Sequence, residues 1–147
     1  MPDDRIHPDI LPHLQAVLTA LAIHLPPEVK SGEWMRPLDV NKRFGDPPYV
    51  LVRVFPSAAQ FNGALDQTQA DIVVRFQVLS VGMTESQALR VGDLARAVMR
   101  RSKVIVPSRY VQDLRLMVAA GGIARDDDLP TPFFYSTDLF ELATTPA

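Results

Sequence analysis

A strictly alternating segment in the middle of the chain restricts most strongly what the rest can fold into. Residues 70–82 read ADIVVRFQVLSVG. Successive side chains of a strand point to opposite faces, so alternation of apolar and polar residues predicts a strand with one buried face and one wet face. The apolar positions are Ile72, Val74, Phe76 and Val78, set against Asp71, Arg75 and Gln77.

A second strand is predicted just before it. Residues 49–55 read YVLVRVF, a β-branched and aromatic run with Val50, Val52 and Val54 on one face. Pro56 is expected to end this strand, and residues 57–69 form a polar, turn-rich excursion. Because the two strands are adjacent in sequence, we expect them to pair antiparallel.

Two helices are predicted from apolar residues at steps of three and four. The first spans residues 9–25, with Asp9 as N-cap and Pro26-Pro27 as its stop. The second begins at a capping box formed by Thr84 and Gln87. The apolar stripes are Ile10, Leu14, Val17, Leu18, Leu21 and Leu25 in the first helix, and Ala88, Val91, Ala95, Val98 and Met99 in the second. Arg90, Asp93, Arg96 and Arg100 are expected to lie mostly outside.

Two further strands follow, at residues 110–119 and 132–143. In the first, alternation groups Tyr110 with Leu114, opposite Val111. The order α-β-β-α-β-β predicts an α+β fold with a mainly antiparallel four-stranded sheet and two helices packed on one face. At 147 residues the chain is expected to form a single domain, residues 1–147.

Three long loops are expected, at about 26–48, 56–69 and 119–131, where many of the thirteen prolines lie. A short strand at Glu33–Leu38 is conceivable, with Trp34 and Met35 covering one end of the core.

The composition lacks the side chains that most catalytic chemistry uses. Cysteine is absent, which excludes disulfides, thiolate metal sites and cysteine nucleophiles. The histidines are His7, His13 and His24, and the last two are about 16 Å apart along one helix, too far to share a metal ion. We expect them to be exposed or half-buried. No phosphate-binding glycine loop occurs. The sequence therefore predicts no enzyme, no cofactor and no metal.

Two charged clusters remain as candidates. Asp126, Asp127 and Asp128 read as a solvated turn rather than a catalytic or metal site, although an acidic loop beside a channel would repel a passing polyanion. Arg96, Arg100, Arg101, Lys103 and Arg109 form a basic cluster. Cations at a helix C-terminus complement its dipole, so this cluster is compatible with nucleic-acid contact or an intersubunit salt bridge. The net charge of −2 argues against an electrostatic clamp.

No apolar run is long enough to span a membrane, and the acidic N-terminus is unlike a secretory signal. We expect a protein made and kept in a cytoplasm.

Several segments together resemble the tail terminator (tail completion) proteins of long-tailed phages, particularly those infecting actinobacteria. The resemblance covers about residues 8–145. It rests on the valine-rich strand after Pro47-Pro48-Tyr49, the run ADIVVRFQV continuing into Ser80-Val81-Gly82 with Thr84, Gln87 and Ala88, and the closing FYSTDLFEL of residues 134–142.

The resemblance implies a structural virion protein at the tail-neck region, assembled in the host cytoplasm. Such proteins form a ring, a hexamer, that caps the head-proximal end of the tail tube and stops its polymerisation. The implied partners are further copies of the chain, the major tail tube protein and the head-tail connector, with DNA passing through the ring without sequence-specific binding and no membrane. The charged candidates Asp126, Asp127, Asp128, Arg96, Arg100 and Arg101 are expected at a subunit interface, the tube face or the lumen.

Two other functions stay open. A neck or head-completion connector would bind the portal side. A small-molecule-binding α/β module is a different class, because the same element order also builds ferredoxin-like sheets.

Overall fold

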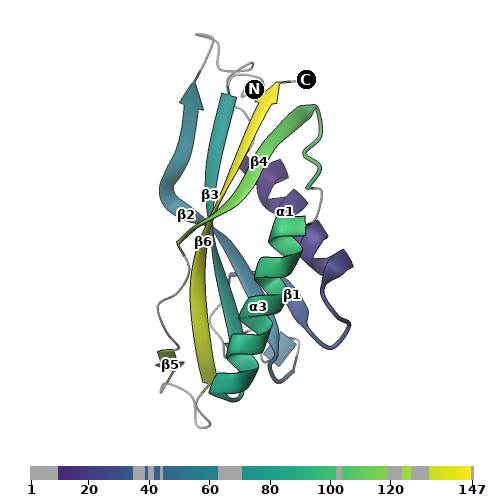
Figure 1. Ribbon diagram of the computed structural model, residues 1–147, viewed down its shortest axis with the longest axis vertical. Coiled ribbons are helices and arrows are strands. Elements are labelled where there is room, and N and C mark those ends of the chain that lie inside the picture. Colours follow the sequence, from purple (N-terminus) through teal and green to yellow (C-terminus); the bar gives the residue numbers. More distant parts are fainter. Residues whose placement is uncertain are drawn as a thin grey trace.

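The computed structural model describes residues 10–34, 39, 42–43, 45–62, 71–101, 104–118, 124–126 and 133–146. The fold is α+β, and both long helices lie on the same side of a long, curled sheet (Figure 1). In chain order the elements are α1 (Ile10–His24), β1 (Lys30–Glu33), β2 (Tyr49–Asn62), β3 (Asp71–Gly82), α3 (Glu85–Arg101), β4 (Arg109–Val118), β5 (Ala124–Asp126) and β6 (Phe133–Pro146).

The sheet has six strands and is mixed, which corrects the predicted four-stranded antiparallel sheet. Its order is β1-β2-β3-β6-β4, and β5 pairs with the first residues of β6. The predicted antiparallel pair β2–β3 is confirmed, whereas β1 runs parallel to β2. β1 and β5 have four and three residues and lie inside the predicted loops 26–48 and 119–131. β1 ends at Glu33, where the short strand suggested from sequence, Glu33–Leu38, was expected to begin, and residues 35–38 lie outside the described residues. Strands this short carry too few residues for a periodic pattern to place them.

β2 continues to Asn62 rather than ending at Pro56, so the predicted loop 56–69 begins later than expected. The register between β2 and β3 shifts between Val54 and Ala59, and Pro56 lies within this irregularity. At a bulge one residue is left out of the strand pairing, so its backbone N–H is not needed as a hydrogen-bond donor. A proline can therefore occupy the bulge without ending the strand.

The main core lies between the helices and one sheet face. Its strand residues are Val50, Val52, Ile72, Val74, Phe76, Val78, Phe140 and Leu142, and its helix residues include Val17, Leu21, Val91, Ala95 and Met99. The apolar stripes predicted for both helices are therefore confirmed as core-facing.

The opposite sheet face is only partly wet, which corrects the expectation for β3. Leu79 and Val81 are buried there against Tyr49 and Leu51 of β2 and Phe133 of β6. Trp34 packs on this second cluster, as predicted, whereas Met35 lies outside the described residues. The polar residues Arg75 and Gln77 led to the prediction that this whole face of β3 is solvated. The end of the strand is instead apolar on both faces.

The start of α3 is built as the sequence predicts. The Gln87 N–H donates to Thr84 Oγ1 at 3.1 Å, and Gln87 Oε1 accepts from the Met83 N–H at 2.7 Å. Gly82 precedes this turn, and a Cβ there would lie 2.5 Å from the Ala88 nitrogen. The helix approaches the end of β3 closely because this position has no side chain.

A bulge in β4 overturns the predicted alternation. Gln112 and Asp113 share one partner position, because the register with β6 shifts between Val111 and Asp113. Val111 and Leu114 consequently both pack against the main core, while Tyr110 is 66% exposed. A bulge inserts one extra residue, which reverses the face of everything beyond it.

Ser80 offers a test of the packing under α3. Its Oγ is buried and, within the described part of the chain, has no hydrogen-bond partner. We expect Ser80→Ala to leave the free energy of unfolding unchanged or raise it by up to about 1 kcal/mol, since no bond is lost and a buried polar atom disappears. Thr144→Val is the matched control, because the Thr144 hydroxyl is bonded to His13 and Arg109. Its loss should cost about 1–3 kcal/mol in urea denaturation, and equal losses for the two variants would contradict this account.

Candidate assembly surface

The outer face of α1 is uncharged, although it is exposed. Leu11 and Ile23 are 56% and 68% exposed, and the polar residues Gln15 and Thr19 lie between them on the exposed side of the helix. The helix ILPHLQAVLTALAIH contains no Asp, Glu, Lys or Arg. Large aliphatic side chains exposed on an uncharged helix surface are typical of a surface that binds a partner.

This face continues into the connection between α3 and β4. Ile105 is 78% exposed, and a shallow groove of about 250 Å³ lies between it and α1. Pro12, Ile23, Ile105 and Pro107 are among the residues that line the groove. We call Ile23, Ile105 and Pro107 the α1 patch.

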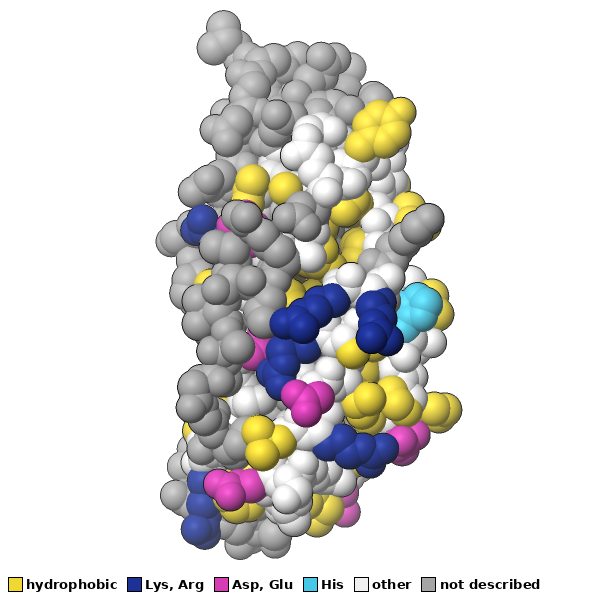
Figure 2. All heavy atoms as spheres, in the orientation of Figure 1, with side chains coloured by type: hydrophobic (Ala, Val, Ile, Leu, Met, Phe, Trp, Pro, Cys, Tyr) yellow, Lys and Arg dark blue, Asp and Glu magenta, His cyan; other side chains and the backbone are white. Residues whose placement is uncertain are grey.

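Arg100 and Arg101 precede the α1 patch in the chain, at the end of α3. Both are exposed in the last turn of α3, and the chain reaches Ile105 four residues after Arg101. Figure 2 shows basic side chains gathered at mid-height of this helical face, next to hydrophobic ones. The C-terminal dipole of α3 favours cations at this position.

Arg96 does not belong to this exposed basic group, which corrects its predicted outward position. Its Nη1 donates to Asp138 Oδ2 of β6 at 2.9 Å, and its Nη2 pairs with Asp93 on the preceding turn. The Asp138 side chain is 1% exposed, while that of Asp93 is 76% exposed. Burial by itself lowers the pKa of Arg96, but hydrogen bonds and charges from Asp93 and Asp138 outweigh it and raise the pKa above its ordinary value. Arg96 thus fixes α3 to β6.

The acidic candidates are only partly placed. Asp126 ends β5, where its backbone pairs with Phe133. Asp127, Asp128 and Lys103 lie outside the described residues.

Sequence reasoning missed a buried polar link between α1, β6 and β4. His13 is fully buried, not exposed or half-buried as expected, and its Nε2 lies 2.8 Å from Thr144 Oγ1. The Arg109 Nε donates to the same oxygen at 2.8 Å, so this member of the predicted basic cluster is engaged in the structure's interior network. His24 is exposed, as expected. The only sequence signal for His13 was its position between Ile10 and Val17 on the core side of the helix.

The sheet face away from the helices carries a paired polar band. The Arg53 guanidinium lies 4.3 Å from the centroid of the Trp34 ring, and its Nε donates to Gln77 Oε1 at 2.6 Å. Arg75 lies 3.3 Å from Glu141 across the β3–β6 pair. These cations are held by neighbours within the subunit.

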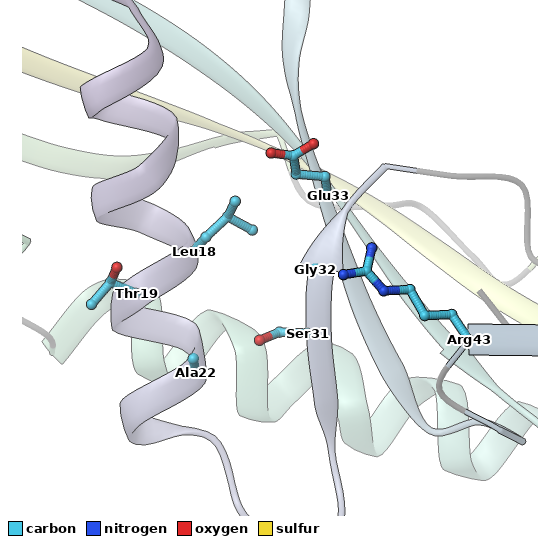
Figure 3. A pocket seen from close by; sticks show the side chains of 7 residues that line it. All are labelled: Leu18, Thr19, Ala22, Ser31, Gly32, Glu33 and Arg43. Atoms are coloured by element: carbon cyan, nitrogen blue, oxygen red, sulfur yellow. The ribbon is translucent and has the colours of Figure 1, made fainter. Parts of the chain in front are cut away.

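A second groove, of about 480 Å³, separates α1 from the edge strand β1. Leu18, Thr19 and Ala22 form its helical wall, and Ser31, Gly32 and Glu33 form the strand wall (Figure 3). Arg43 extends its guanidinium toward β1 from the side opposite α1. Four of the seven lining residues, Thr19, Ser31, Glu33 and Arg43, have polar side chains.

In the described ranges, no cluster of three His, Asp or Glu side chains has the geometry to hold a metal ion. No described helix combines the length and apolarity that crossing a membrane requires.

Comparison with known proteins gives a match at the level of structure. No protein-family model and no curated protein matches the sequence. Among solved structures, the chain is similar to one in the "Virion of native gene transfer agent (GTA) particle", with a TM-score of 0.57 and 14% sequence identity. The match covers 89% of this chain and 92% of the other. The two chains share a fold over nearly their whole lengths.

Proposed function

We propose that this chain is a structural virion protein, a tail terminator whose ring caps the head-proximal end of a phage-type tail tube and offers the joining surface for the head. The observation that carries the proposal is the fold shared, across 89% of the chain, with a component of a gene transfer agent virion. The sequence resemblance to tail terminators points independently to the same class of particle. The proposed role is assembly and not catalysis.

The surface chemistry supports an assembly role. Three of the large apolar side chains exposed on the described surface, Leu11, Ile23 and Ile105, belong to α1 and to the segment that leads from α3 into β4, and Tyr110 lies on β4 itself. Ile23 and Ile105 line one groove, and exposed apolar side chains that lie together are typical of protein interfaces. In the proposed assembly a hexameric ring of this chain surrounds DNA without reading its sequence, at the tail-neck junction of a particle built in the host cytoplasm.

The test is a tube-capping experiment. Major tail protein of the same particle is polymerised with and without this chain, and tube lengths are measured by electron microscopy. We expect tubes formed with the chain to stop growing and to carry a ring at one end. Bovine serum albumin at equal concentration serves as the inert control.

A pull-down separates the terminator from a connector of the neck. Immobilised chain should retain tail tube protein. Retention of portal protein alone, together with uncapped tubes, would overturn the terminator role in favour of the head-completion role.

A further inference from the structure

A second apolar surface lies at the other end of α3. Met83 and Leu89 are 42% and 51% exposed at the start of the helix. Glu85 and Asp93 lie one turn before and one turn after Leu89 on the same stripe. We call Met83, Glu85, Leu89 and Asp93 the α3 patch.

The α1 patch and the α3 patch have opposite charge at their borders. Arg100 and Arg101 precede the α1 patch in the chain, whereas Glu85 and Asp93 belong to the α3 patch, where Asp93 also pairs with Arg96 of its own chain. Each patch centres on exposed aliphatic side chains, Ile23 and Ile105 in one and Leu89 in the other. Apolar centres with complementary charged rims are the pattern of a specific protein interface.

The two patches are separate surfaces of one chain. Leu89 lies in the second turn of α3, whereas Ile105 follows the last residue of the helix, Arg101, so the two apolar centres lie at opposite ends of α3. A contact between two different surfaces is heterologous and repeats in one direction, and such a contact closes into a ring when the rotation between copies allows it.

α1 itself shows why its outer face needs a partner. α3 carries charged side chains along its exposed side, whereas α1 carries none. Covering Ile23 and Ile105 would remove from solvent the two most exposed aliphatic side chains in the described part of the chain.

We propose that the α1 patch of one copy docks on the α3 patch of a second copy, with Arg100 and Arg101 facing Glu85 and Asp93. This deepens the proposed function, since it names the surfaces that would build the ring. Because the contact is tested without tail tubes, a ring that fails to cap tubes would count against the proposed function and not against this contact.

The first test uses one substitution in each patch. Ile105→Asp places a carboxylate opposite Glu85 and Asp93, and Leu89→Lys places an ammonium opposite Arg100 and Arg101. Each variant should weaken self-association at least about thirtyfold in analytical ultracentrifugation, as the loss of an interface hot spot does. Both residues are exposed, so circular dichroism melting should match the wild type.

Mixing the two variants distinguishes a head-to-tail contact from a symmetric one. The mixture contains one intact pair of surfaces, the α3 patch of the Ile105→Asp chain and the α1 patch of the Leu89→Lys chain, so association should return. Arg125→Asp, on exposed β5, is the matched control and should associate like the wild type. A wild-type chain that stays monomeric at every concentration, or a mixture that does not associate, overturns the proposal.

The absence of cysteine allows a direct second test. A chain carrying both Ile105→Cys and Leu89→Cys should give a ladder of covalent multimers with a short bismaleimide. Each single variant should give no ladder, and the pair Ile105→Cys with Arg125→Cys should not either. Efficient dimer formation by Ile105→Cys alone would show a symmetric contact and overturn the head-to-tail arrangement.

Discussion

Replacing Arg96 with alanine is expected to lower the free energy of unfolding by about 3 kcal/mol or more. The substitution leaves the Asp138 carboxylate, whose side chain is 1% exposed, without the guanidinium that lies 2.9 Å away. A buried carboxylate that loses its guanidinium keeps much of its desolvation cost, which is larger than the value of an exposed ion pair. Urea denaturation at neutral pH measures the effect.

Asp93→Ala is the matched control, since it removes the other partner of the same arginine. The Asp93 side chain is 76% exposed, and its pair with Arg96 spans three residues on the helix surface. Its loss should cost less than about 1 kcal/mol. In the Arg96→Ala background, Asp138→Asn should recover part of the lost stability because it removes the buried charge. Equal effects of Arg96→Ala and Asp93→Ala would show that the buried pair does not anchor α3 to β6.

Phe140→Ala is expected to lower the free energy of unfolding by about 3–5 kcal/mol. Phe140 and Phe76 are both fully buried and stand opposite each other in the β3–β6 register. Truncating the ring opens a cavity between the central strands of the sheet and the two helices, where neighbouring side chains collapse only partly.

Tyr110→Ala is the control for loss of an aromatic ring. Tyr110 is 66% exposed on β4, so its truncation should change the stability of the isolated chain by only about 0.5 kcal/mol. The comparison requires monomeric conditions, and a loss at position 140 no greater than that at position 110 would contradict the assigned core.

The elements with a strong local pattern were predicted from sequence. The helix at residues 10–24, the capping box of Thr84 and Gln87, and the antiparallel pair of β2 and β3 all follow from residue spacing that acts over a few turns or pairs. In these segments the local conformational preference and the pattern of burial favour the same structure. Each element can therefore be predicted from its own stretch of sequence.

The candidate site was predicted less completely. Arg100 and Arg101 of the predicted basic cluster are exposed. Arg96 instead turns inward and bonds to Asp138, which lies forty-two positions away in the sequence. Nothing within the helix indicates Asp138 as its partner, because that contact depends on how α3 crosses β6. The same holds for His13, whose partner Thr144 lies 131 residues away.

From its own residues the chain specifies an α+β domain without thiols, with two helices and long amphipathic strands, since periodicity and composition are properties of local sequence. The placement of β1 and β5 on the sheet, the bulge that brings Val111 to the core, and the groove that Ile23 shares with Ile105 depend on the packed chain. Each of these three features brings together residues that are distant in sequence. Bringing such residues together costs conformational entropy, so they meet only where the tertiary contacts are favourable enough to offset that cost.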